Sequence, residues 1–423
     1  MSKYIVRNNG PLKGEVSISG SKNAVLPLMA ASLLTSEKCE ICDTPALRDV
    51  DVMCSIIRAM GGKVDFDKDS NCVEIETNTI TYNGANSELA SKMRASILVM
   101  GPLLARTGKA TIALPGGCAI GARPIDLHLK GFEAMGVKIW EKHFDGFDYV
   151  VAEAEKLVGC DIYLDFPSVG ATENLMMTAV LAEGATTIQN AAEEPEIVDL
   201  ANFLNKMGAK VKGAGTATIR IEGVSTLRGT KHHVIPDRIE TGTFMLAAAI
   251  TRGEIKLKNA VASHVRPLIA KLKECGAVVR EEDDGISVSA KDRKLVSTNL
   301  KTLPYPGFPT DLQSPFMSLL VTTEGTGMVI ETVFENRFMH IAELQKMGAI
   351  IDYSDRKAII TGTDKLQGAS VKATDLRAGA ALVLAGLAAE GTTEVDQVYY
   401  IERGYERFVE KMSGVGADIE YIE

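Results

Sequence analysis

The chain of 423 residues has one tryptophan, Trp140, and no apolar run near the roughly 18 residues that a membrane-spanning helix needs. It also has no basic run. Its 46 Lys and Arg stand against 55 Asp and Glu, which gives a net charge of −9. These absences exclude a membrane-spanning helix and argue against binding to nucleic acid or an anionic membrane. The opening residues, MSKYIVRNNG, form no apolar signal region, so we expect the chain to stay in the cytoplasm.

Cysteine is sparse: seven residues at irregular spacing predict reduced thiols and no disulfide framework. Cys39 and Cys42 form a CxxC motif, but it lies in a predicted strand, has no second CxxC, and precedes every His. We therefore assign it no metal or redox role. P-loop, strand-coupled GxGxxG and HExxH motifs are also missing, and no cofactor or metal is expected. Four cysteines are interpreted as small buried hydrophobic side chains, namely Cys54, Cys72, Cys160 and Cys275.

What the sequence does contain is a sixfold repeat. A helix-like segment ends at a Met-Gly or similar step and enters an apolar strand at six places, which lie 68 to 75 residues apart. The repeats fill the chain, and its length favours two domains of three repeats each. The glycines of these steps are Gly61, Gly136, Gly208, Gly276, Gly348 and Gly416.

Each repeat also contains a second helix, rich in Ala, Gly, Ser and Met, which is followed by a polar turn such as Glu183-Gly184. The glycine after the first, amphipathic helix suits a left-handed C-cap. The small residues of the second helix suit a helix packed on all sides. Helices that are apolar all round beneath sheets predict an inside-out α/β fold. The alternative is a scaffold whose stacked repeats only bury a continuous core.

The starts of the inner helices carry unexpected charge. Counting 14 residues back from each polar turn gives a set of six positions, three of them charged, and Lys22 stands beside the first. Because an unpaired buried charge is costly, we expect these helix ends to open onto a solvated cleft or a ligand. The alternative is that the charges pair with one another as ion pairs between domains. The six positions are Asn23, Arg94, Gly170, Ile239, Asp311 and Arg377.

The second repeat carries a loop insertion, LPGGCAIGARPIDLH (114–128). From the turn glycine Gly108 to Arg123 the chain runs 15 residues, against 11 and 12 at the matching points of the third and sixth repeats. Three glycines, together with Pro115, predict a mobile surface loop. Cys118 at its centre is therefore predicted to be an exposed, reactive thiol.

The motifs SKNA (21–24) and PGGCAIGARPIDLH closely resemble those of the UDP-N-acetylglucosamine 1-carboxyvinyltransferase family, enolpyruvyl transferases of peptidoglycan synthesis. The resemblance implies two domains that together form an inside-out α/β barrel pair built from six βαβ-type repeats of about 70 residues. Residues 22–235 would form one domain and 1–21 plus 236–423 the other, with the active site in the interdomain cleft. Further blocks that resemble the family are FPSVGATEN (166–174), EEPEIVDLANFL (193–204), PDRIETGTF (236–244), PGFPTDLQ (306–313), ETVFENRFMH (331–340), ATDLRAGAALVLAG (373–386) and IERGYERF (401–408).

The resemblance implies transfer of the enolpyruvyl group of phosphoenolpyruvate to the 3′-hydroxyl of UDP-N-acetylglucosamine. Phosphate would leave through a tetrahedral addition intermediate, without a cofactor, in an enzyme that the epoxide fosfomycin inactivates. Cys118 would be the general acid, able also to form a covalent phospholactoyl thioether, and Asp311 the base for the sugar hydroxyl. Lys22 and Arg403 would be the other catalytic residues.

The same resemblance assigns the binding residues. Phosphoenolpyruvate would be bound by Lys22, Asn23, Arg123, Arg337, Arg377 and Arg403. UDP-N-acetylglucosamine would be bound by Arg94, Arg123, Pro124, Ile125, Asp126, Leu127, Ser168, Val169, Gly170, Asp311 and Val333, with Glu194 at a neighbouring position.

One residue departs from the family pattern, and two other functions stay open. Phe166 stands where some members have a lysine, so the diphosphate is expected to meet one fewer cation. The 3-phosphoshikimate 1-carboxyvinyltransferases share the fold and the chemistry, but the resemblance to them lacks the Cys118 loop. A non-enzymatic ring or clamp would not concentrate Lys22, Arg94, Asp311 and Arg377 at helix starts.

Overall fold

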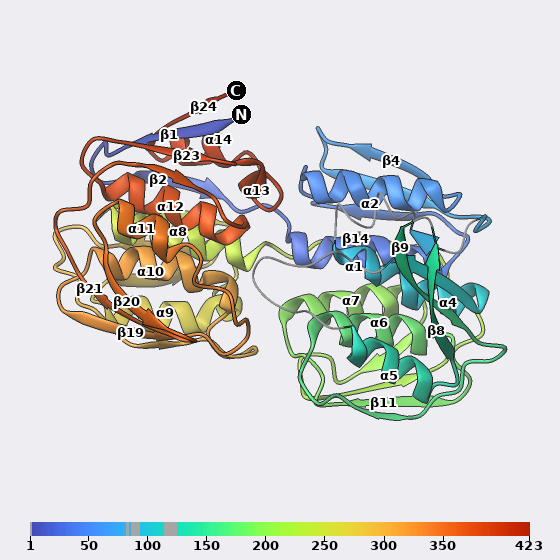
Figure 1. The fold of residues 1–423 in the computed structure, drawn as a ribbon. Helices are drawn as coiled ribbons and strands as arrows, with labels where there is room; N and C mark the ends of the chain where they lie inside the picture. Colours follow the sequence, from blue (N-terminus) through green and yellow to red (C-terminus); the bar gives the residue numbers. More distant parts are fainter. Residues whose placement is uncertain (1, 82–83, 86–93, 114–124, 145) are drawn as a thin grey trace. The chain divides into compact units, whose positions relative to one another are not determined.

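The computed structural model describes residues 2–81, 84–85, 94–113, 125–144 and 146–423 (Figure 1). These residues fall into two compact units. Unit 1 contains residues 2–19 and 236–423, and unit 2 contains the described residues between 20 and 235. Throughout these ranges, every helix is too short or too polar to cross a membrane.

Each unit holds three four-stranded sheets that share one plan within the described residues. The first two strands of each sheet are parallel and the remaining pairs are antiparallel. The same plan occurring six times confirms the sixfold repeat. The sheets of unit 2 are β14-β3-β5-β4 (Lys231–His233, Cys39–Cys42, Cys72–Glu76, Lys63–Asp67), β6-β7-β9-β8 (Gly84–Ala85, Lys109–Ala113, Phe147–Glu153, Lys138–Phe144) and β10-β11-β13-β12 (Asp161–Tyr163, Ala185–Gln189, Thr218–Glu222, Lys210–Lys212).

The sheets of unit 1 draw in the first strands of the chain. β1 lies between β23 and β24, and β2 pairs with β15. The sheets are β2-β15-β17-β16 (Lys13–Ser17, Glu254–Lys258, Gly285–Ser289, Val278–Glu282), β18-β19-β21-β20 (Leu300–Lys301, Thr326–Ile330, Lys357–Thr361, Ile350–Ser354) and β22-β23-β1-β24 (Ser370–Lys372, Thr392–Asp396, Lys3–Arg7, Asp418–Ile422).

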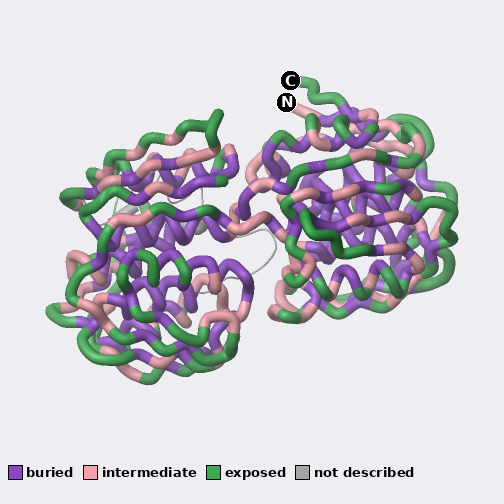
Figure 2. Tube along the Cα trace, turned by 180° about the vertical axis from the view of Figure 1, so that it is seen from behind, coloured by how far each residue is buried: buried purple, intermediate pink, exposed green. Residues whose placement is uncertain are grey.

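Three inner helices form the centre of each unit, and the sheets lie outside them. In α8, every residue from Ile239 to Ile250 is buried. Figure 2 shows this buried interior in each unit, with exposed residues on the outside. The fold is therefore the predicted inside-out α/β arrangement. The inner helices are α1 (Lys22–Ala31), α4 (Met100–Thr107) and α6 (Val169–Ala179) in unit 2, and α8 (Arg238–Ile250), α10 (Gln313–Val321) and α12 (Leu376–Ala388) in unit 1.

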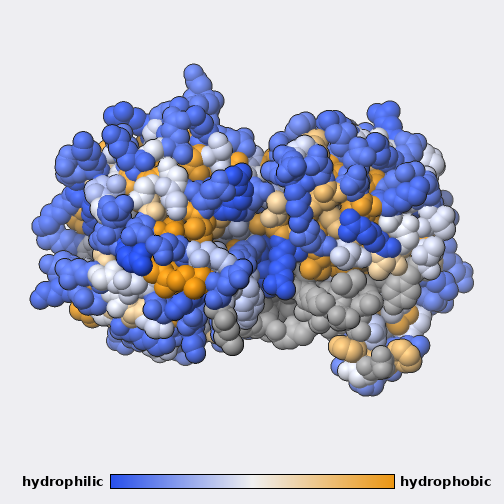
Figure 3. All heavy atoms as spheres, turned by 90° about the horizontal axis from the view of Figure 1, so that it is seen from above, coloured by the Kyte–Doolittle hydropathy of each residue, from blue (hydrophilic) through white to orange (hydrophobic). Residues whose placement is uncertain are grey.

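The outer helices bury one face and leave polar residues at the surface, which is largely hydrophilic in the view of Figure 3. Each of the six outer helices is followed by its repeat glycine, and the φ angles of these glycines lie between 89° and 105°. At Gly208 the next residue, Ala209, donates its N–H to the Leu204 carbonyl at 3.0 Å, which confirms the predicted left-handed C-cap. The outer helices are α2 (Arg48–Ala59), α5 (Asp126–Ala134), α7 (Pro195–Lys206), α9 (Arg266–Glu274), α11 (Ile341–Lys346) and α14 (Phe408–Gly414). Shorter turns are η1 (Ser32–Leu34), η2 (Arg94–Val99), η3 (Ala262–Val265), η4 (Thr310–Leu312) and α13 (Tyr399–Glu402).

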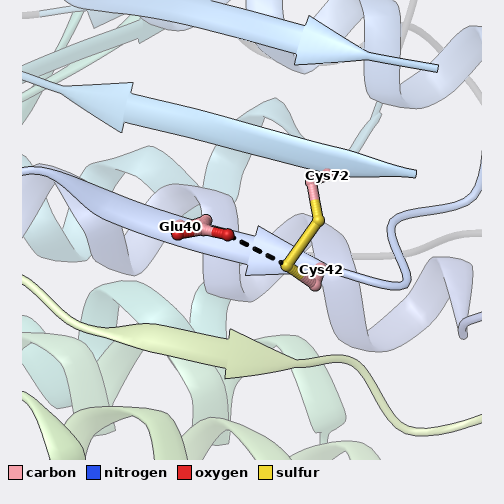
Figure 4. Close-up of side chains that lie close together, drawn as sticks. All are labelled: Glu40, Cys42 and Cys72. Carbon is pink, nitrogen blue, oxygen red and sulfur yellow. Dashed lines mark hydrogen bonds between the residues drawn. A yellow bond between two sulfur atoms is a disulfide. The ribbon is translucent and has the colours of Figure 1, made fainter. Parts of the chain in front are cut away.

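The prediction for the cysteines needs one correction. Cys42 and Cys72 form a disulfide between β3 and β5, so they are not reduced thiols, and Cys72 is not a buried hydrophobic side chain (Figure 4). The two residues are register partners in an antiparallel pair, which their separation of 30 residues in the sequence could not reveal. Cys54 and Cys275 are buried as predicted, and Cys160 is half-buried.

A close helix contact in unit 2 generates a stability prediction. Gly101 of α4 donates its N–H to Asn174 Oδ1 of α6 at 2.8 Å. A Cβ on Gly101 would lie 2.5 Å from the Asn174 carbonyl oxygen, which is backbone and cannot turn away. We expect Gly101→Ala to lower the free energy of unfolding by about 1–3 kcal/mol, the usual range for overpacking. Urea unfolding measures the change.

The matched control is Asn202→Ala on the exposed side of α7 in the same unit. It should change the unfolding free energy by no more than about 0.5 kcal/mol. A Gly101→Ala variant with the wild-type urea midpoint would show that α4 and α6 do not need this close contact.

Candidate functional site

Asp311 of unit 1 lies in η4, just before α10, and two arginines hold its carboxylate. Arg337 Nη2 donates to Oδ1 at 2.8 Å, and Arg377 Nη2 donates to Oδ2 at 3.2 Å. Both arginine side chains are 3% exposed, whereas the Asp311 side chain is 26% exposed. The cluster thus consists of two buried cations and one carboxylate that solvent can reach.

The two arginines still have unused hydrogen-bond donors. Nε and Nη1 of Arg337 and Nη1 of Arg377 are buried and have no partner among the described residues. A buried donor without an acceptor costs about 1–3 kcal/mol, so an added carboxylate or phosphate oxygen would be stabilising here. The planar guanidinium group suits such anions because it can donate two parallel hydrogen bonds.

Glu331, which is not among the predicted site residues, joins the turn of Asp311 to that of Val333. Its carboxylate accepts from Thr310 Oγ1 at 3.0 Å and from the Val333 N–H at 2.7 Å. The Glu331 side chain is buried although it is acidic. An acidic residue directly after the apolar strand β19 was the signal that could have identified it.

Arg403 lies next to the start of α12. It follows α13 and is partly buried. A Cβ on the following residue, Gly404, would lie 2.6 Å from Leu376 Cδ2, so this turn packs against the first residue of α12. Asp375 caps the same helix and accepts from the Arg377 N–H at 2.9 Å. Unit 1 therefore brings its predicted site residues together at the N-terminal ends of α10 and α12.

Lys22 of unit 2 is the first residue of α1, and Asn23 follows it. Lys22 Nζ lies 2.7 Å from Asp49 Oδ2 of α2, and both side chains are largely buried. Asp311 and Arg377 thus pair with each other, as the alternative interpretation supposed, whereas Lys22 pairs with a residue outside the set of inner-helix starts. The ion pair of Lys22 lies within unit 2, and those of Asp311 with Arg337 and Arg377 lie within unit 1.

The two segments predicted to bind the nucleotide sugar lie side by side in unit 2. Residues 125–127 begin α5, and residues 168–170 begin α6. A Cβ on Gly170 would lie 3.3 Å from His128 Cε1, and His128 Nδ1 lies 3.0 Å from Asn174 Nδ2. The side chain of Ser168 caps α6 by accepting from the Ala171 N–H at 3.4 Å. Two neighbouring helix N-termini suit an anionic ligand.

Acidic residues adjoin this pair of helix starts. Glu194 is the N-cap of α7 and is buried. Glu173 of α6 is also buried, and its Oε1 has no partner among the described residues. Burial, together with the charges of Glu196 and Glu194, raises the pKa of Glu173 well above its ordinary value of 4.5. The environment therefore favours the protonated form of Glu173.

Cys118, Arg123 and Pro124 lie outside the described residues, as does the side chain of Arg94. Phe166 is 44% exposed, and its carbonyl accepts from the Ser168 N–H at 2.7 Å. At this position the chain offers an aromatic ring where a lysine would offer a charge.

Known proteins are similar to this chain over its full length. UDP-N-acetylglucosamine 1-carboxyvinyltransferase 1 of Caldanaerobacter subterraneus subsp. tengcongensis is 57% identical over 419 residues, which cover 99% of both chains. UDP-N-acetylglucosamine 1-carboxyvinyltransferase 2 of Carboxydothermus hydrogenoformans is 57% identical over 423 residues, which cover 100% of both.

Solved structures show a similar fold. The enolpyruvyl transferase NikO from Streptomyces tendae has a TM-score of 0.89 at 24% identity, covering 99% of this chain and 98% of that one. EPSP synthase from Acinetobacter baumannii has a TM-score of 0.77 at 19% identity, covering 100% of both chains. At these identities the two structures support the fold alone. Residues 6–412 match the model of the EPSP synthase (3-phosphoshikimate 1-carboxyvinyltransferase) family. The chain therefore belongs to the EPSP synthase family, and its similarity to UDP-N-acetylglucosamine 1-carboxyvinyltransferases extends over its whole length.

Proposed function

We propose that this protein transfers the enolpyruvyl group of phosphoenolpyruvate to the 3′-hydroxyl of UDP-N-acetylglucosamine and releases phosphate. We place the reaction in the cytoplasm, as a step of peptidoglycan synthesis. The observation that carries the proposal is the 57% identity, over the full length, to two relatives of that name. The arginine pair beside Asp311 supports it, because phosphoenolpyruvate carries a phosphate and a carboxylate.

In this proposal the residues of unit 1 act on the reacting groups. Asp311 takes the proton of the sugar hydroxyl, since its carboxylate is solvent-accessible and two fixed arginines orient it. Arg337, Arg377 and Arg403 bind the anionic groups of phosphoenolpyruvate, and charge on the departing phosphate would be stabilised by the same cations. Val333, which Glu331 holds in place, would contact the sugar.

Residues of unit 2 complete the proposed assignment. Lys22 and Asn23 bind phosphoenolpyruvate together with Arg123, and Cys118 protonates its methylene carbon. The nucleotide sugar binds at the paired helix starts, 125–127 and 168–170, with Arg94 and Pro124. The departure at Phe166 leaves the diphosphate with one fewer cation.

The catalytic role of Asp311 is tested by Asp311→Asn. The amide preserves the shape of the side chain but cannot accept the hydroxyl proton, so we expect kcat to fall by roughly 10²- to 10⁴-fold, with a folded protein. Phosphate release is measured with phosphoenolpyruvate plus UDP-N-acetylglucosamine. A parallel assay with shikimate 3-phosphate as acceptor should show no release.

The control variant is Asp364→Asn, an exposed aspartate of the same unit, which should keep the wild-type rate. If Asp311→Asn instead retains full activity and melts at a lower temperature, Asp311 is only a partner in ion pairs. Phosphate release from phosphoenolpyruvate with shikimate 3-phosphate as acceptor, but not with UDP-N-acetylglucosamine, would assign the chain to the other branch of its family.

The role of Cys118 is tested by alkylation. A thiol on a glycine-rich loop with Arg123 and Lys22 as expected neighbours should ionise readily, so fosfomycin should inactivate the enzyme by labelling Cys118. Peptide mapping identifies the adduct. Cys118→Asp should keep part of the activity, since a carboxyl group can donate a proton, and should resist the epoxide. Cys160→Ser, the control, should remain sensitive, whereas an inactivating adduct on Cys54 or Cys160 would contradict the assignment.

A further inference from the structure

One face of the sheet β14-β3-β5-β4 in unit 2 brings together two sulfur atoms and a carboxylate (Figure 4). Cys42 of β3 and Cys72 of β5 are register partners and form the disulfide. Glu40 projects from the same face of β3, and its Oε1 lies 3.4 Å from Cys42 Sγ. The two sulfur atoms and the carboxylate oxygen all lie within 4.8 Å of one another. Three potential metal ligands are therefore already adjacent.

The two cysteines of the CxxC motif, Cys39 and Cys42, are not the two that lie together on this face. Cys39 and Cys42 are three residues apart in a strand, so their side chains project to opposite faces of the sheet. Cys39 is fully buried, and burial raises the pKa of its thiol to about 11. The pair on the face of Glu40 is Cys42, which is 4% exposed, with Cys72, because the neighbouring strand supplies the second sulfur.

The strand on the other side of β3 carries a histidine next to Cys42. β14 runs parallel to β3, and His233 is the register partner of Cys42, so both project to the same face. His233 Nδ1 lies 2.9 Å from Asp43 Oδ2. A carboxylate on one ring nitrogen is the usual arrangement for a histidine that binds metal through the other. The His233 side chain is 65% exposed and can turn toward the sulfur atoms.

We propose that the reduced form of this cluster binds Zn²⁺ or a similar soft divalent cation through Cys42, Cys72, Glu40 and His233. Two thiolates, an imidazole and a carboxylate form a tetrahedral donor set of the kind that zinc takes. The disulfide and the metal exclude each other, because the disulfide leaves no thiolate. Lys231 Nζ lies 2.6 Å from Glu40 Oε1 in the disulfide form. The Lys231 side chain is 58% exposed and can move away, and the metal ion would then supply the positive charge beside Glu40.

The conversion between the two forms balances with a dithiol as reductant. The dithiol gives two electrons and two protons to the S–S bond, which breaks and becomes the thiols of Cys42 and Cys72. The dithiol is itself oxidised to a disulfide. The cation then displaces both thiol protons, which pass to solvent. The cluster is therefore a metal site that opens only under reducing conditions, and it does not depend on the proposed enzymatic function.

The test uses the full chain and Co²⁺ as a spectroscopic probe. Protein reduced with dithiothreitol, then desalted without oxygen, should bind one equivalent of Co²⁺ with a thiolate-to-cobalt charge-transfer band and tetrahedral d–d bands. The oxidised protein should show neither. Cys160→Ser, which removes a half-buried thiol of the same unit, should keep both features, and the double variant Cys42→Ser/Cys72→Ser should lose them.

His233→Ala alters an exposed side chain, so it tests the site without endangering the fold. It should weaken Co²⁺ binding by at least about tenfold. The proposal is overturned if reduced wild type shows no thiolate band or if the band persists in the double serine variant. It is equally overturned if His233→Ala binds Co²⁺ as tightly as wild type.

Discussion

Burial of the inner helices on every side is the constraint on which the rest of this structure depends. Their flanks consist mostly of small or apolar residues, as Gly101 shows by lying against the backbone of α6, and a buried polar side chain such as Asn174 is hydrogen-bonded. Several charged residues stand at the helix starts, where the chain leaves the core, as Lys22, Asp311 and Arg377 do. There, buried charge is tolerated because each cation has a partner, Asp49 for Lys22 and Asp311 for two arginines. The proposed site residues Lys22, Asp311 and Arg377 therefore stand at the starts of their helices.

That constraint explains how far the sequence alone could predict the fold. An inner helix must cross a core of nearly constant thickness, so the distance from its start to the next polar turn varies little. Counting back from that turn selected Asn23, Gly170, Ile239 and Arg377, and each is the second residue of its helix. The repeat glycines were equally predictable, because a left-handed helix end leaves few other choices. The motif resemblance then assigned roles to individual residues, which the spacing of the repeats alone could not do.

What the sequence could not predict was pairing between distant residues. Asp311 and Arg377 are 66 positions apart, and Gly101 and Asn174 are 73 apart. The link that Glu331 makes between two turns, like the cross-strand position of Cys72, exists only after the sheets have formed. The CxxC spacing did not indicate the pair of Cys42 and Cys72 for the same reason. In a strand, the alternation of faces separates Cys39 from Cys42, and the relevant partner comes from another strand.

The position of β1 has a consequence for the order of assembly during synthesis. This strand is made first, yet it lies between β23 and β24, and its Lys3 bonds to Glu394, 391 residues later. Its buried residues, Tyr4 and Val6 among them, must wait without partners while nearly the whole chain is translated. An unpaired apolar strand is prone to wrong pairing during that interval. Unit 2 has no such delay, because the strands of its sheets all lie between residues 39 and 233 and can pair while the ribosome is still producing unit 1.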